Sequence, residues 1–143
     1  MAGQRIITKD QFLKRIGDLC LRSGLAGFPK DEADQHILLK SAVLMIGNGE
    51  GLAEPEVNAW LKLWSQVTQN KGIDHGTLRR RLVDTGYLVR SKDGAAYRVC
   101  PGGTGKFEFE AAIDQIDVAE AIACAREEIE RRKQQYLAKS RKE

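Results

Sequence analysis

The sequence is poor in the residues that build metal centres and disulfide frameworks. It has three cysteines and two histidines in 143 residues. Cys20, Cys100 and Cys124 are odd in number and far apart, which favours a reducing compartment over a disulfide-stapled secreted fold. His36 and His75 each lack a second histidine or cysteine at the spacing of a zinc-ligand pair. The sequence therefore predicts a cytoplasmic protein without a metal site.

Long apolar stretches are also missing. The longest one, residues 36–47, is interrupted by Lys40 and is shorter than the roughly 20 residues that a membrane-spanning helix needs. Residues 1–10 contain no apolar core of the kind found in signal peptides. We therefore expect a soluble protein with no membrane partner.

The sequence contains no catalytic or nucleotide-binding fingerprint. The segment PGGTGKF (residues 101–107) is similar to part of a phosphate-binding loop, but Cys100 stands at the first glycine position and Phe107 follows Lys106. GNGEG, at residues 47–51, lacks the spacing and the preceding strand of a dinucleotide-binding turn. There is no Gly-x-Ser-x-Gly nucleophile motif. We therefore expect no enzymatic activity and no cofactor.

What the chain does contain is enough apolar material for one core and a local excess of positive charge. Hydrophobic residues make up 42% and charged residues 30% of the sequence, which is typical of a globular domain. The net charge is +3. Residues 74–99 hold six basic and three acidic residues, so this stretch alone accounts for the whole excess.

Three amphipathic segments before residue 70 predict helices. The first begins at a capping box formed by Thr8 and Gln11. The second opens after Pro29 and continues to residue 46, with apolar residues around most of its circumference. Compensation of the helix dipole explains three acidic residues in its first turn: Asp31, Glu32 and Asp34.

The third predicted helix, residues 54–64, contains both tryptophans. Trp60 and Trp64 lie on the same apolar stripe, at the i, i+4 spacing. Aromatic side chains can also stack on nucleic-acid bases. The position on the stripe favours packing of both rings in the core.

A fourth helix and a β-hairpin follow. The helix begins at Asp74 and ends at Gly86, a typical C-cap residue. YLVR and AAYRV then flank the turn SKDG, which predicts the hairpin. Over residues 30–99 the order of elements is that of a winged helix-turn-helix, with residues 74–85 as the recognition helix. The connection before Asp74 is longer than the tight turn of that motif.

A long charged helix is predicted from Asp117 onward. It carries a narrow apolar seam of period 3.5 that would pack on the domain or on a second chain, so a homodimer through this helix is a candidate assembly. We expect an α+β, mainly α, fold with a winged-helix-like domain (residues 28–100) between an N-terminal helical extension (1–27) and a loop with the long C-terminal helix (101–143). The seam consists of Val118, Ile122, Ala125, Ile129 and Tyr136.

Several of these segments resemble one bacterial family. They are FPK (residues 28–30), LL (38–39), EVN (56–58), DHGTLRRRLVDTGYLVR (74–90) and GAAYR (94–98). In these motifs the sequence resembles domain-of-unknown-function family 2087, whose members occur alone or at the C-terminal end of transcription-regulator-like proteins. The resemblance spans residues 28–99 and implies a small winged-helix-like domain, for which a nucleic-acid role has been suggested on fold grounds. It implies no established activity.

The three consecutive arginines of the fourth helix do not share a face, because successive residues are rotated by about 100°. Arg79 is bracketed by Leu82 and Val83 on the inward side. We expect its stem to lie across the core and its guanidinium to pair with a carboxylate or with backbone carbonyls. Glu56 is the candidate partner.

The remaining basic residues suggest a nucleic-acid-binding surface, which would include Thr77 on the outward face of the helix. The alternative is a solvated charged face, since Asp84 lies between Arg80 and Arg81 on the helical wheel. The first hypothesis is a DNA-binding module with a role in transcriptional regulation, and the other is a protein-interaction or dimerisation module without DNA binding. The predicted nucleic-acid contacts are Thr77, Arg80, Arg81, Arg90, Lys92 and Arg98.

Overall fold

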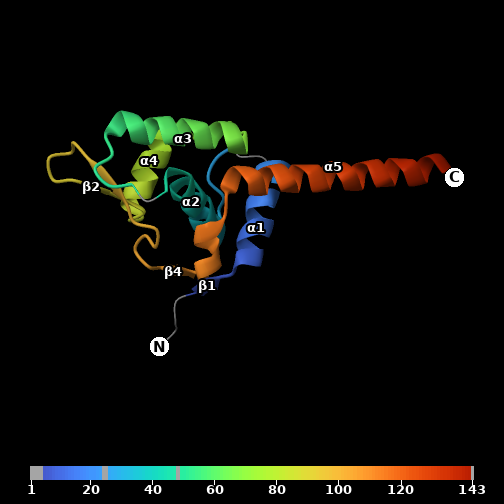
Figure 1. The fold of residues 1–143 in the computed structure, drawn as a ribbon, viewed down its shortest axis with the longest axis horizontal. Helices are drawn as coiled ribbons and strands as arrows, with labels where there is room; N and C mark the ends of the chain where they lie inside the picture. Colours follow the sequence, from blue (N-terminus) through green and yellow to red (C-terminus); the bar gives the residue numbers. More distant parts are fainter. Residues whose placement is uncertain (1–4, 24–25, 48, 143) are drawn as a thin grey trace.

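The computed structural model describes residues 5–23, 26–47 and 49–142. These residues form a mainly helical structure with two small sheets, which confirms the expected α+β, mainly α class (Figure 1). The elements are β1 (Arg5–Ile7), α1 (Lys9–Gly17), η1 (Asp18–Ser23), α2 (Glu32–Ile46), α3 (Glu54–Thr68), α4 (His75–Asp84), β2 (Leu88–Arg90), β3 (Tyr97–Val99), β4 (Phe107–Phe109), η2 (Ala111–Gln115) and α5 (Val118–Lys142).

Three helices begin where the sequence predicts them, at side chains that cap free backbone N–H groups. The Thr8 hydroxyl accepts from the backbone N–H of Gln11 at 3.1 Å, at the start of α1. Asp31 caps α2 and Asp74 caps α4 in the same way. At the end of α4, Gly86 has a φ of 83°, a left-handed conformation that glycine adopts without strain.

Helix α2 is the centre of the core. Its residues 36–43 are all buried, as expected for a helix that is apolar around most of its circumference. Helix α3 packs on it through Val57, Leu61 and Trp64, and the indole N–H of Trp64 donates to the Ser41 hydroxyl at 2.9 Å.

The prediction that Trp60 also packs in the core is wrong. This side chain is 37% exposed, whereas Trp64 is fully buried. On a helical wheel Trp60 lies about 100° from Leu61, at the edge of the buried stripe. It therefore leaves one face of its ring open to solvent.

The hairpin is built from β2 and β3, which pair antiparallel with Leu88 opposite Val99 and Arg90 opposite Tyr97. Its loop spans residues 91–96 and is closed by a bond from the Ser91 N–H to the Ala96 carbonyl at 2.8 Å. It is therefore longer than the predicted turn. On the other side of β3, Leu52 and Tyr97 exchange two backbone hydrogen bonds, so the hairpin acquires a third, one-residue strand between α2 and α3.

A second sheet joins the start of the described chain to the segment before η2. Strand β1 pairs in parallel with β4, with Ile7 opposite Phe109. Neither strand was predicted, because each has only three residues and its partner lies about a hundred positions away.

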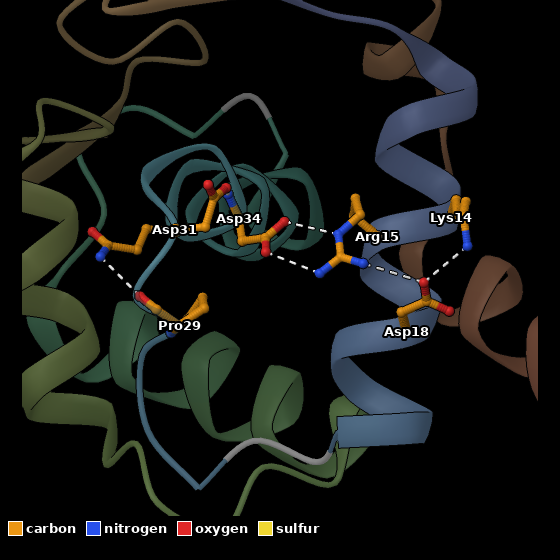
Figure 2. Close-up of polar contacts among 7 residues, drawn as sticks. Lys14, Arg15, Asp18, Pro29, Asp31 and Asp34 are labelled. Atoms are coloured by element: carbon orange, nitrogen blue, oxygen red, sulfur yellow. Dashed lines mark hydrogen bonds and ion pairs between the residues drawn. The ribbon is translucent and has the colours of Figure 1, made fainter.

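The acidic first turn of α2 makes ion pairs in addition to compensating the helix dipole. Asp34 accepts two hydrogen bonds from Arg15 of α1, from Nε and from Nη2, each 2.9 Å long (Figure 2). Arg15 also contacts Asp18, which in turn binds Lys14. Glu32 pairs with Lys106. Asp34 therefore holds α1 against α2, and Glu32 holds the segment before β4 against α2.

Helix α5 follows the predicted seam only over its first turns. Val118 and Ile122 are buried against the core, whereas Tyr136 is 71% exposed. Figure 1 shows the C-terminal half of α5 extending well beyond the rest of the fold. None of the helices among the described residues has the length and apolarity needed to cross a bilayer.

Candidate nucleic-acid interface

A cavity of about 290 Å³ lies between α4, the start of α3 and the hairpin. Helix α4 packs on the core through the buried side chains of Leu78 and Leu82, which leaves its other faces open. The turn at Gly86 then brings the hairpin back alongside α4. We call this cavity the arginine groove; its lining residues are Glu54, Arg79, Arg80, Val83, Asp84, Arg90 and Tyr97.

Arg79 makes the inward contact that the helical wheel predicts, but with different partners. Its Nη1 donates to the side-chain carbonyl of Asn58, and its Nε lies 3.8 Å from a carboxylate oxygen of Glu54. The expected pairing with Glu56 is wrong. Glu56 is rotated by about 200° from Glu54 on α3, and it accepts instead from the backbone N–H of Ala53 at the helix start.

Two of the predicted contact residues, Arg80 and Arg90, line the arginine groove together. Arg90 lies on the same hairpin face as Tyr97, its partner in the β2–β3 register. A Cβ added at Gly94 would lie 2.7 Å from Arg90 Nη2, so the loop glycine leaves room for this guanidinium. The two arginines reach the groove from opposite walls, one from α4 and one from the hairpin.

Thr77 and Arg81 are engaged elsewhere on α4. The Thr77 hydroxyl donates to the Asp74 carboxylate at 2.8 Å, and its backbone N–H donates to the same carboxylate. These bonds lower the pKa of Asp74, so the cap is charged at neutral pH. The Arg81 guanidinium lies over the Phe28 ring, 4.8 Å from its centroid, in a cation–π contact.

The other two predicted residues lie on the hairpin outside the groove. Lys92 is exposed in the loop. Arg98 is opposite Val89, on the face of the hairpin that points away from Tyr97. The structure therefore brings Arg80 and Arg90 together and places Thr77, Arg81, Lys92 and Arg98 around them at separate positions.

Sequence analysis missed Glu54, one of the two acidic residues that line the groove. The Tyr97 hydroxyl donates to Glu54 at 3.0 Å, and Tyr97 is 3% exposed. Burial, and secondarily the Glu54 carboxylate, raise the pKa of Tyr97. The only signal for this contact was the position of Glu54 in the first turn of a predicted helix, which dipole compensation already explains.

A buried lysine lies apart from the groove, beside two cavities of about 270 and 260 Å³. Lys40 of α2 is 2% exposed, and its ammonium donates to Asp114 at 2.8 Å and to the Pro101 carbonyl at 2.9 Å. This pair fixes η2 and the loop after β3 to the central helix. The part of the chain that the structure describes contains no cluster of three or more side chains suited to hold a metal ion.

The comparison with family models shows which protein family the chain belongs to. The model of an uncharacterized protein conserved in bacteria (DUF2087) matches residues 24–99. The chain belongs to this family. The match confirms the resemblance found in the sequence, and it covers α2 through β3, every element that lines the arginine groove. No curated protein and no solved structure shows a significant match to the chain.

Proposed function

We propose that this chain is a cytoplasmic, non-enzymatic winged-helix module that binds double-stranded DNA and acts in transcriptional regulation. The observation that carries the proposal is the isolated β-bridge at Leu52, which follows α2 and pairs with Tyr97 of β3 on the side away from β2. The order helix, bridge, two helices and hairpin, with β3 between the bridge and β2, supports a winged-helix interpretation. In that arrangement α4 is the recognition helix and residues 91–96 are the wing.

The charges around α4 support the same proposal. Arg80 and Arg90 line one groove, and Lys92 extends the positive surface onto the wing. Guanidinium and ammonium groups bind phosphates through charge-assisted hydrogen bonds and release counterions. Thr77 and Arg81 flank the groove along α4. Arg98 would contact the sugar–phosphate backbone of DNA from the outer face of the hairpin.

Glu54 and Asp84 also line the groove, and each would repel a phosphate placed next to it. Because acidic and basic residues alternate in the groove, DNA would bind in one orientation that keeps its phosphates away from the two carboxylates. Glu54 already holds Arg79 and Tyr97, so its charge is partly compensated within the protein. The phosphates then meet the outer edge of the groove, where Arg80 and Arg90 are exposed.

A protein-interaction function is the second candidate, and α5 favours it. Tyr136 and Leu137 are exposed on the part of this helix that extends away from the fold. Dimerisation through α5 is also compatible with DNA binding, since paired recognition helices read paired half-sites.

The proposal is tested by fluorescence anisotropy with a labelled random duplex of about 25 base pairs at low salt. The Arg80→Ala/Arg90→Ala variant should bind at least about tenfold more weakly than the wild type. The matched control is Lys9→Ala/Lys14→Ala, which removes the same charge from exposed positions on α1 and should bind like the wild type. Absence of binding by the wild type would reject the DNA proposal and favour the protein-interaction function.

A further inference from the structure

A groove of about 400 Å³ with a mixed apolar and polar lining lies between the end of α2, α3 and the start of α5. Trp60, which lines it, is 37% exposed. Asp117 adds a carboxylate at the rim. The apolar residues that line the groove are Leu44, Met45, Trp60, Ile116, Val118 and Ala119.

The chain also has an exposed apolar pair that no described residue covers. Tyr136 is 71% and Leu137 40% exposed, and every residue from 130 to 141 is exposed. Helix α5 has 25 residues and is therefore about 37 Å long. Its C-terminal part, residues 131–142, which we call the tail, reaches far beyond the fold (Figure 1).

The tail and the start of α5 at the groove carry opposite charges. Residues 131–142 contain six basic and no acidic residues, and Glu143 follows them. Asp117 lines the groove, and Glu120 follows it in the first turn of α5. Complementary charge of this kind favours the approach of a tail to the groove of another molecule.

A tail cannot reach the groove of its own chain, because α5 is one continuous helix that starts at the groove. We propose that two copies of this chain associate through an antiparallel pair of α5 helices, so that the tail of each copy is seated against this groove of the other. This deepens the dimer that the proposed function allows, and it does not depend on DNA binding.

The α5 sequence supports one register for this pair. One exposed stripe of the helix has spacings of 4, 3, 4, 3 and 4 residues, which keep it on one face, and it has three charged residues between apolar ends. With Leu137 opposite Ala119 of the second copy, Arg126 lies opposite Glu130, and Lys139 lies opposite Asp117. Two-fold symmetry repeats each pair. The stripe consists of Ala119, Ala123, Arg126, Glu130, Lys133 and Leu137.

The test is sedimentation equilibrium of the full chain, without nucleic acid, at about 50 μM and low salt. The wild type should be a dimer. Arg126→Glu and Glu130→Arg should each weaken self-association by at least about tenfold, because each variant places like charges opposite one another twice. An equimolar mixture of the two variants should form a heterodimer, since opposite charges then face each other at both positions. Leu63→Ala, at an exposed α3 position outside the groove, should remain dimeric.

A monomeric wild type, or single variants that dimerise as the wild type does, would overturn the proposal. If the wild type is a monomer, a separate DNA titration of Lys139→Ala/Arg141→Ala follows. Weaker DNA binding by this variant would show that the tail is a nucleic-acid-binding arm. The sedimentation experiment contains no DNA, so a monomeric result does not bear on the proposed DNA contacts of Arg80 and Arg90. A failed DNA titration likewise leaves the dimer untouched.

Discussion

The hydroxyl of Tyr97 in β3 donates a 3.0 Å hydrogen bond to the carboxylate of Glu54 in the first turn of α3. The same carboxylate lies 3.8 Å from Nε of Arg79 in α4. Glu54 therefore contacts both walls of the arginine groove, and its position determines how the hairpin is held against α4.

Tyr97→Phe keeps the buried ring and removes only the hydroxyl. We expect the free energy of unfolding to fall by about 1–2 kcal/mol, because the lost hydrogen bond has a charged acceptor. Urea denaturation followed by circular dichroism measures this change. Tyr136→Phe, at a position 71% exposed, is the matched control and should shift stability by less than about 0.5 kcal/mol. Equal effects of the two substitutions would contradict the role of the Glu54 contact.

Arg15→Ala should destabilise the fold through the carboxylate it leaves behind. Asp34 is 9% exposed and accepts both of its side-chain bonds from Arg15 (Figure 2). Because Arg15 itself is partly exposed, we expect a loss of about 1–3 kcal/mol, less than for a fully buried pair. Lys14→Ala removes an exposed cation one position earlier and should cost about 0–0.5 kcal/mol. If Arg15→Ala lost no more stability than Lys14→Ala, the Asp34 carboxylate would be solvated by water in the variant.

The two sides of the Lys40–Asp114 pair should respond differently to mutation. Lys40 is 2% exposed, whereas the Asp114 side chain is 53% exposed. Lys40→Met removes the buried charge and leaves a carboxylate that water can solvate, so stability should stay within about 1 kcal/mol of the wild type. Asp114→Ala leaves the ammonium buried and should cost about 2–4 kcal/mol. Thermal unfolding of both variants checks this order, and the reverse order would contradict it.

Stability should fall on acidification because of His36. This imidazole is 6% exposed and lies 2.8 Å from the Tyr87 hydroxyl, in a hydrogen bond through Nδ1. Burial lowers the pKa of His36, so the unfolded chain takes up a proton before the folded chain does. The stabilisation is complete above the unfolded pKa and is lost as the pH falls from about 7 to 5.

Urea midpoints measured across this pH range test the assignment to His36. His36→Gln should flatten the profile over that interval. His75→Gln, which leaves the buried imidazole in place, should retain the wild-type slope. A His36→Gln profile as steep as the wild type would assign the dependence to other groups.

Helix starts could be predicted from the sequence because their causes are local. Thr8, Asp31 and Asp74 each cap a backbone N–H within three residues, and the hydrophobic period follows directly. Strands β1 and β4 could not be predicted, because three residues carry no period and their pairing joins distant positions. The single bridge at Leu52 was missed for the same reason.

For the candidate site, the sequence predicted which face of α4 each arginine lies on, but not which residues it contacts. The helical wheel placed Arg79 inward, but its contacts depend on which turn of α3 lies beside α4, and this selects Glu54 rather than Glu56. The stacking of Arg81 on Phe28 depends on the path of the loop before α2. Such contacts are set by tertiary packing, which a single sequence does not encode locally.

The most direct test of the account is the salt dependence of duplex binding by the wild type and by Arg80→Ala/Arg90→Ala. A plot of log affinity against log salt concentration should be steep for the wild type, and its slope should be smaller by about 2 for the variant, because two phosphate contacts are lost. An unchanged slope, or no binding by the wild type even at about 50 mM salt, would contradict the assignment of the arginine groove to DNA.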